Sequence, residues 1–255
     1  VTKFIIVEST YSHSGAKKKI NFDKNLYPQF KDKIEHIIVD KEPENILDID
    51  NTHKDINKRT NSILRISLQR NEALKGCKEA SGEDYIFYSD NDEIPNFGEI
   101  NFYKNKSKYI IFEQKLFYYK FNLLNERIFW YGTKGAQKKY IKLISDLRNI
   151  KPKKYPIWRI DTLFSNIKFS NLKIIKNGGW HFTQLKKPED LFEKIKNDEH
   201  HNEFDKLDMN VDHIKNMIEN KFIEYDHLSD SKSTSKIGNR FKLKSIDINS
   251  NMPTY

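Results

Sequence analysis

The sequence predicts an α/β fold in which a mainly parallel central sheet is flanked by helices. Short apolar runs at residues 4–7, 37–39 and 85–88 are bounded by polar residues, as buried strands usually are. A helical pattern at 56–78 lies between the second and third runs. Strands that alternate with helices are typical of βαβ units. We therefore expect a Rossmann-like domain that binds ligands beyond the carboxyl ends of its strands.

The second half of the sequence is more helical. Two further strands are expected at 109–112 and 116–121, both rich in aromatic residues. Helices are expected over 188–204, which begins with a proline and two acids, and over 211–219. These elements extend the same fold and do not indicate a second one.

A single domain is expected over residues 1–228, because the sequence has no internal repeat and no clear linker. Hydrophobic residues make up 37% of the chain and aromatic residues 13%, which excludes a disordered protein. The polar run SDSKSTSK opens the region 229–255, which we expect to be a partly mobile tail.

Charge and cysteine content limit the partners and the compartment. The 45 basic and 36 acidic residues give a net charge of +9, which attracts phosphate-bearing partners in general. Cys77 is the only cysteine, so an intramolecular disulfide and a multi-cysteine metal site are excluded. The sequence lacks a signal peptide pattern and a long apolar run. We expect a cytoplasmic protein without an anchor, and leave open peripheral membrane association through its basic surface.

The acidic motif Asp90-Asn91-Asp92 is the strongest chemical signal, and Glu93 and Pro95 follow it. The motif comes directly after an apolar strand, which we expect Pro95 to end. Three carboxylates within four residues repel one another unless a cation lies among them. Mn²⁺ and Mg²⁺ prefer oxygen ligands, and the phosphates of a nucleotide would complete their coordination. The alternative is a solvated acidic turn.

Three sequence blocks resemble the conserved blocks of glycosyltransferase family 17, the family of the β-1,4-mannosyl-glycoprotein 4-β-N-acetylglucosaminyltransferase. They are VESTYSHSGAKKKINF at 7–22, SDNDEIP at 89–95 and GGWHF at 178–182, and the run EHHNEF at 199–204 resembles a later helix of bacterial members. The matching residues are Glu8, Ser9, Tyr11, Gly15, Phe22, Asp90, Asp92, Glu93, Ile94, Pro95, Gly179, Trp180, His181, Phe182, His201 and Glu203.

This resemblance implies a GT-A fold, a UDP-sugar donor (foremost UDP-GlcNAc), a glycan acceptor and inversion at the anomeric carbon. Asp90 and Asp92 would hold Mn²⁺ or Mg²⁺ against the donor diphosphate, with Asp92 as the direct ligand. His181 could complete the metal shell or pack as a structural residue. Trp180 could stack on a sugar or fill the core.

The remaining candidates serve the donor and the acceptor. Many GT-A enzymes carry an Arg-Asn pair near the nucleoside, and Arg70 and Asn71 match it on the helix before the acidic motif; a surface charge and an ordinary polar residue are the alternatives. Glu8 would contact the nucleotide base or ribose, or be a buried structural acid. Inversion needs a general base to take the acceptor proton. Glu203 is the first candidate for the base, and the alternative is a charge on the surface of a helix.

Asp161 and Glu113 are the alternative candidates for the base.

Functions other than sugar transfer stay open as well. A nucleic-acid-binding protein would need a basic stripe with interleaved aromatics, which the sequence lacks, so we expect no nucleic-acid partner. A metal-dependent nucleotidyltransferase or phosphoesterase could use the same aspartates. A sugar-binding relative without activity is the third alternative.

Overall fold

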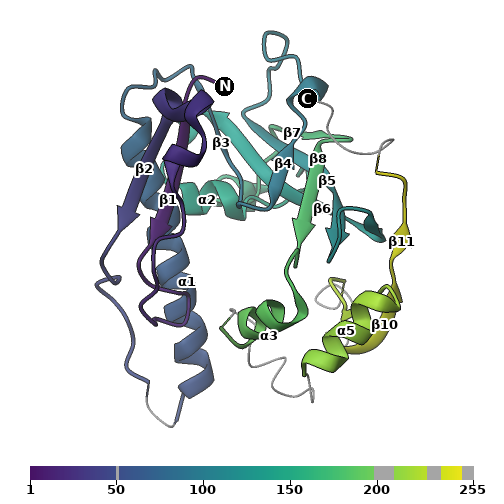
Figure 1. Cartoon of the computed structure of the whole chain (residues 1–255). Helices are drawn as coiled ribbons and strands as arrows, with labels where there is room; N and C mark the ends of the chain where they lie inside the picture. Colours follow the sequence, from purple (N-terminus) through teal and green to yellow (C-terminus); the bar gives the residue numbers. More distant parts are fainter. Residues whose placement is uncertain (50–51, 198–209, 229–236, 249–255) are drawn as a thin grey trace.

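The computed structural model describes residues 1–49, 52–197, 210–228 and 237–248 (Figure 1). Its first part is a parallel pair of strands packed on a long helix. β1 (Phe4–Ser9) and β2 (Ile34–Val39) pair in register along their whole length, and α1 (Lys54–Glu72) lies alongside them. The Gln69 side chain on α1 donates a hydrogen bond to the Val7 carbonyl at 2.9 Å, which ties the helix to β1. The first two expected strands and the helix after them are therefore confirmed.

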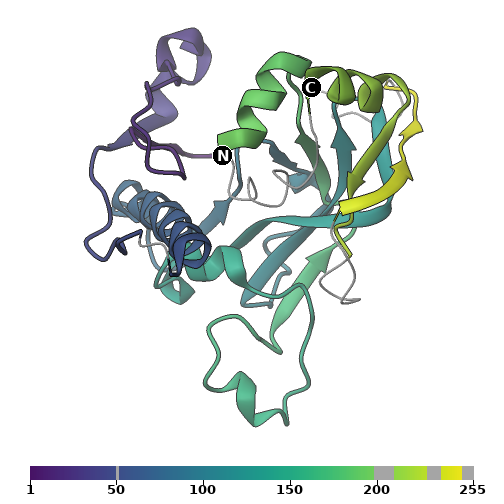
Figure 2. The same cartoon turned by 90° about the horizontal axis from the view of Figure 1, so that it is seen from below.

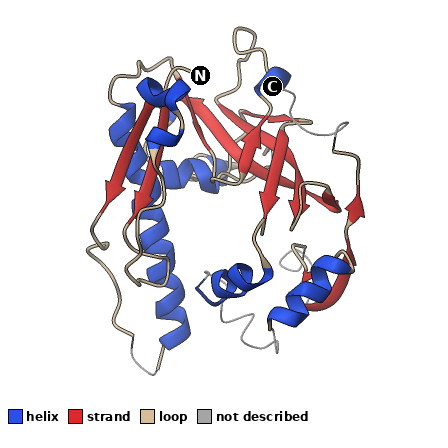
Figure 3. Ribbon diagram, in the orientation of Figure 1, coloured by secondary structure: helices blue, strands red, loops and turns tan. Residues whose placement is uncertain are grey.

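A seven-stranded sheet forms the centre of the molecule (Figure 3). Its strand order is β11-β6-β5-β8-β4, with β3 also paired to β6 and β7 also paired to β5. The strands are β3 (Tyr85–Tyr88), β4 (Glu93–Pro95), β5 (Tyr109–Tyr118), β6 (Leu123–Gln137), β7 (Leu172–Ile175), β8 (Gly179–Thr183) and β11 (Lys244–Ser245).

The expected mainly parallel sheet is wrong, because this central sheet is mixed. β5 pairs in parallel with β7 and β8, but β3, β5 and β11 are all antiparallel to β6, and β4 is antiparallel to β8. The cause is the short connection at residues 119–122 between β5 and β6, since a tight turn can join only antiparallel neighbours. The two strands expected at 109–112 and 116–121 are a single strand with bulges. The GT-A assignment stays an expectation.

The core follows β5, which is buried on both faces. Ile110, Ile111, Phe112, Leu116 and Phe117 are all fully buried. A strand covered on both faces is apolar along its whole length, which explains why this segment does not alternate. Three separate apolar clusters extend from it, toward α2, toward α5 and toward the aromatic residues around Phe97.

Two helices and a hairpin cover one end of the central sheet. These are α3 (Pro188–Asn197), α5 (Val211–Glu219), β9 (Phe222–Tyr225) and β10 (Ile237–Lys242). Leu191 and Ile214 pack with Tyr119 and Leu123 of the sheet. Residues 237–245, which fall in the expected tail, form β10 and β11. The two helices expected in this half are present within the described residues, but 198–204 lies outside them.

Short elements complete the chain and position the site. α2 (Ile144–Asn149) lies beside α1, and 3-10 helices occupy Lys24–Leu26, Pro28–Lys33, Ala73–Cys77, Phe97–Glu99, Lys138–Tyr140 and Ile160–Thr162. Figure 2 shows the segment between α2 and β7 projecting from the body, on the side away from α3 and α5. Among the described residues, no helix is long and apolar enough to cross a membrane.

Candidate active site

The acidic motif lies in a tight turn between two strands. β3 ends at Tyr88, and the Glu93 backbone N–H donates to the Asp90 carbonyl at 3.1 Å, which closes the turn. Pro95 does not end β3 as expected; it belongs to the next strand, β4. β4 pairs with β8 and places Glu93 opposite His181. The fold therefore brings the acidic motif and the distant GGWHF block side by side.

Two glycines allow the chain to approach this closely. Gly179 has a φ of +125°, and a Cβ there would lie 2.0 Å from the Ile94 carbonyl oxygen. Gly132 on β6 lies against Glu93, where a Cβ would come within 2.6 Å of the carboxyl carbon. Any larger residue at either position would push the acidic turn out of place.

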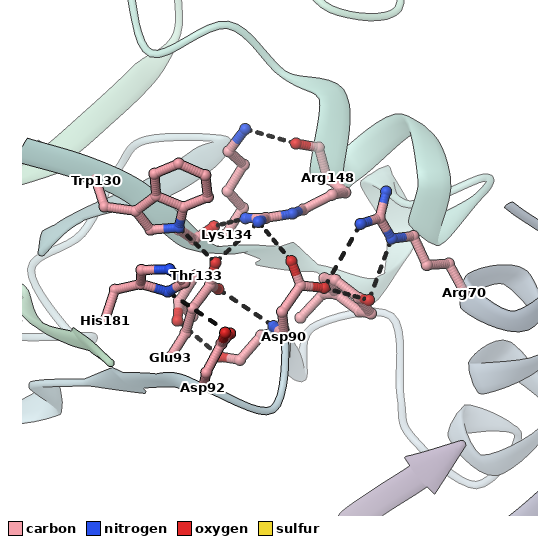
Figure 4. Close-up of polar contacts among 12 residues, drawn as sticks. Arg70, Asp90, Asp92, Glu93, Trp130, Thr133, Lys134, Arg148 and His181 are labelled. Atoms are coloured by element: carbon pink, nitrogen blue, oxygen red, sulfur yellow. Dashed lines mark hydrogen bonds and ion pairs between the residues drawn. The ribbon is translucent and has the colours of Figure 1, made fainter. Parts of the chain in front are cut away.

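Arg148 of α2 holds two of the three acids (Figure 4). Its Nη2 donates to Asp90 Oδ2 at 2.6 Å and to Glu93 Oε1 at 2.8 Å, and its Nη1 donates to the Gly132 carbonyl at 2.5 Å. Trp130 Nε1 donates to the same Glu93 oxygen at 2.7 Å. A protein cation therefore relieves much of the repulsion that the sequence led us to assign to a metal.

These contacts set the protonation of the two acids in opposite directions. Burial raises the pKa of Asp90, but the charges of Arg148 and Arg70 outweigh it, and its pKa lies below the ordinary value. Burial raises the pKa of Glu93, and the attraction of Arg148 does not fully offset this. Asp90 is therefore the firmly ionised partner of the arginine.

Asp92 faces a different partner. Its Oδ1 lies 3.6 Å from His181 Nδ1, and that buried nitrogen makes no hydrogen bond to any residue that the structure describes. The imidazole stacks on Trp130 with ring centroids 4.6 Å apart. Burial, followed by the charge of Arg148, lowers the pKa of His181 to about 3, so the ring is neutral. Burial and then the Asp90 charge raise the pKa of Asp92.

Arg70 and Asn71 support the site from α1. Arg70 Nε donates to the Tyr88 hydroxyl at 3.2 Å, and that hydroxyl donates to Asp90 Oδ1 at 2.8 Å. Asn71 Oδ1 accepts a hydrogen bond from the Ser145 backbone at 3.0 Å, which fixes the start of α2. The expected pair therefore reaches the acidic turn, through Tyr88 and through the helix that carries Arg148.

A hollow of about 320 Å³ opens beside Asp92. It combines aromatic surface with two lysines, and such a lining suits a ligand that carries both an apolar or sugar face and negative charge. The lining residues are Asn91, Asp92, Ile94, Phe121, Phe182, Gln184, Leu185, Lys186 and Lys194.

Two predicted donor residues lie elsewhere. Glu8 accepts hydrogen bonds from the backbone N–H groups of Asn21 at 2.8 Å and Phe22 at 3.0 Å, so it fastens the loop after β1. Trp180 neighbours His181 on β8, and alternation along the strand turns it to the opposite face. These contacts match the structural alternative for Glu8, and Trp180 lies on the face of β8 opposite to His181.

Asp161 and Glu113, two of the three candidate bases, pair with cations other than those that contact the acidic turn. Asp161 is exposed and pairs with Arg159 at 2.7 Å and Lys168 at 2.9 Å. The side-chain hydrogen bonds of those two cations lower its pKa to about 2. Glu113 is buried beneath Lys176, at 2.6 Å. Glu203 lies outside the described residues.

The comparisons with known proteins identify the family. The model of glycosyltransferase family 17 matches residues 1–146, more than half of the chain. The chain belongs to glycosyltransferase family 17. No curated protein and no solved structure matches it. The family-17 match includes Arg70, Asp90 and Asp92 and stops before Arg148 and His181, so it does not test the roles of those two residues.

The family-17 site contains residues that the sequence did not single out. Arg148, Trp130 and Lys134 lie within or beside the acidic turn, and Lys134 Nζ donates to the carbonyls of Arg148 at 2.5 Å and Ile150 at 2.7 Å. Nothing near Arg148 in the sequence marks it, because its partners are 55 and 58 residues away. The available signal was general, namely that clustered carboxylates need a cation.

Proposed function

We propose that the chain is a metal-dependent, inverting glycosyltransferase that moves GlcNAc from UDP-GlcNAc to a glycan acceptor. Membership of family 17 supports sugar transfer in general. The donor, the metal and the acceptor are the proposal's own additions, and they follow from the family resemblance of the three sequence blocks together with the arrangement around Asp92.

The pairing of Asp92 with His181 is the observation that carries the metal site. Arg148 binds both Asp90 and Glu93 but not Asp92. Asp92 instead faces a buried imidazole nitrogen that has no hydrogen-bond partner within the described part of the chain. One carboxylate oxygen and one neutral imidazole nitrogen fit Mn²⁺ better than Mg²⁺. No group of three His, Cys, Asp or Glu side chains suited to a metal occurs among the described residues, so donor phosphates would have to supply further ligands.

A divalent ion held here would act as a Lewis acid toward the charge that develops on the departing nucleotide diphosphate. The chain's own residues supply the remaining functions. Lys186 and Lys194 line the hollow next to Asp92 and place positive charge where phosphates would lie. Trp130 holds the His181 ring by stacking, and Arg148 keeps Asp90 from competing for the ion.

Glu203 stays our proposed general base. One-step inversion needs a base that takes the proton from the acceptor hydroxyl. Asp161 is an unfavourable choice because two cations hold it ionised and its pKa is too low to accept a proton readily at neutral pH. Glu203→Gln is expected to keep donor binding and lose transfer, and unchanged transfer would remove Glu203 from this role.

The deciding experiment measures UDP release from a panel of UDP-sugars, with Mn²⁺, with Mg²⁺ and with EDTA. We expect release from UDP-GlcNAc with Mn²⁺, and none with EDTA. Turnover of nucleoside triphosphates in place of UDP-sugars would favour a nucleotidyltransferase. Release that is unaffected by EDTA would refute the metal requirement while leaving sugar transfer in place.

A further inference from the structure

The projecting segment between α2 and β7 carries an exposed apolar tip. Five large side chains gather within eight residues, and each exposes more than two thirds of its surface. Apolar side chains scattered singly over a surface are ordinary, but a contiguous group marks an interaction site. They are Ile157 at 84% exposed, Trp158 at 82%, Ile160 at 71%, Leu163 at 76% and Phe164 at 87%. Figure 2 shows that the main body does not cover this segment.

Hydrogen bonds define the conformation of this loop, and its apolar side chains are exposed. At its base, Lys151 N donates to Ile167 O at 2.8 Å, and Tyr155 N donates to Phe169 O at 3.1 Å. At its tip, Ile160–Thr162 forms a 3-10 turn, in which Asp161 accepts a hydrogen bond from the Arg159 side chain. These hydrogen bonds join the two ends of the loop and shape its tip, while the apolar side chains stay exposed.

Basic residues surround the apolar tip. Residues 151–168 contain five Lys or Arg and a single acid, Asp161. The charge of that acid is taken up by Arg159 and Lys168. Lys151, Lys153 and Lys154 lie near the base of the loop, behind the tip, and add to a chain of net charge +9. The loop is therefore apolar at its end and positively charged farther back.

This order of groups matches the depth profile of a membrane surface. Tryptophan and aliphatic side chains partition into the boundary between head groups and acyl chains, and lysines behind them meet anionic head groups. We propose that the tip at residues 157–164 inserts into the head-group region of an anionic lipid membrane and docks the protein peripherally. The proposal does not depend on the transferase reaction proposed above.

Vesicle binding tests the proposal. The full chain is sedimented with vesicles of phosphatidylcholine alone and of phosphatidylcholine with phosphatidylglycerol. We expect binding to the anionic vesicles and little binding to the neutral ones. The double variant W158S/F164S and the variant K151E/K153E should each bind at least about tenfold more weakly.

A matched control variant distinguishes binding through the loop from non-specific binding through other exposed apolar side chains. Leu26 and Ile56 are also large, apolar and exposed, at 71% and 67%, and lie outside the loop. L26S/I56S should bind like the unaltered chain. The proposal would be overturned if W158S/F164S and L26S/I56S lost vesicle binding equally, or if the unaltered chain did not bind anionic vesicles. Concentration-dependent self-association that W158S/F164S abolishes, in the absence of vesicle binding, would assign the tip to a second copy instead.

Fluorescence gives a second readout. An inserted Trp158 should shift its emission to the blue and be quenched by brominated lipids. W158F keeps an aromatic ring, so it should retain binding while losing most of the shift. A shift of equal size in W158F would mean that Trp130 or Trp180 responds, and would refute insertion of the tip. Unchanged urea midpoints are expected for all the loop variants, because the altered side chains are exposed.

Discussion

Arg148 and Asp90 are joined by a 2.6 Å hydrogen bond between charged groups that lie 58 residues apart in the chain. The same guanidinium nitrogen reaches Glu93, which is fully buried. Arg148 is itself only 10% exposed. Two of the acids next to the proposed metal position, Asp90 and Glu93, are thus paired with Arg148, whereas Asp92 faces His181.

Arg148→Met should destabilise the fold strongly. Removing a buried cation leaves the carboxylates of Asp90 and Glu93 without their main partner, and breaking a buried pair in this way costs about 3 kcal/mol or more. Urea unfolding measures the change. The control is Arg159→Met, which removes an exposed pair with Asp161 and should change stability much less. Similar losses in both variants would show that Arg148 makes no special contribution.

Asp92→Asn and Asp90→Asn should affect different properties. Asp92→Asn removes the proposed ligand, so UDP affinity in Mn²⁺ should fall by at least about tenfold while the unfolding midpoint changes little. Asp90→Asn weakens the contacts to Arg148 and Tyr88, so stability should fall by about 1–3 kcal/mol. Calorimetric titration and urea unfolding of both variants separate the two effects. If Asp90→Asn alone abolished Mn²⁺-dependent UDP binding, the metal would belong to Asp90.

His181→Gln should change the choice of metal. A neutral imidazole favours Mn²⁺ over Mg²⁺, and an amide oxygen removes most of that preference. The ratio of UDP dissociation constants measured in Mg²⁺ and in Mn²⁺ should therefore fall by about tenfold. His181→Phe, which keeps a ring to stack on Trp130, serves as the control for packing. A ratio unchanged in both variants would exclude His181 as a ligand.

The sequence predicted single elements better than their arrangement. The strand at 85–88 and the helix at 211–219 were found with their true bounds, because an uninterrupted apolar run and a helical period are local signals. Strand direction was not predictable in the same way. β6 was missed because its residues switch between exposed and buried without a regular period, and this missing strand is what makes the sheet mixed.

The site was predictable where one motif held the chemistry. Asp90, Asp92 and His181 lie close together, as the sequence blocks implied, and the second glycine of GGWHF, Gly179, is explained by its contact with Ile94. The arginine partner could not be found, because a contact between residues in different elements leaves no spacing to recognise. Asp161 was a candidate through its acidity alone, and its contacts show that it braces a surface loop.

Lys134 should make stability depend on pH in the alkaline range. Burial, followed by the charge of Arg148, lowers its pKa from 10.5 to about 7. Between these values the unfolded chain holds a proton that the folded chain does not, so stability rises with pH by about 1.4 kcal/mol per unit. Below about pH 7 both states are protonated and this slope disappears.

Urea unfolding from about pH 7.5 to about pH 9.5 should show the slope in the unaltered chain and not in Lys134→Met. Lys139→Met is the control, because its hydrogen bond to Glu83 raises the pKa of Lys139 and both states stay protonated in this range. Parallel curves for the unaltered chain and Lys134→Met would mean that Lys134 keeps its charge when buried.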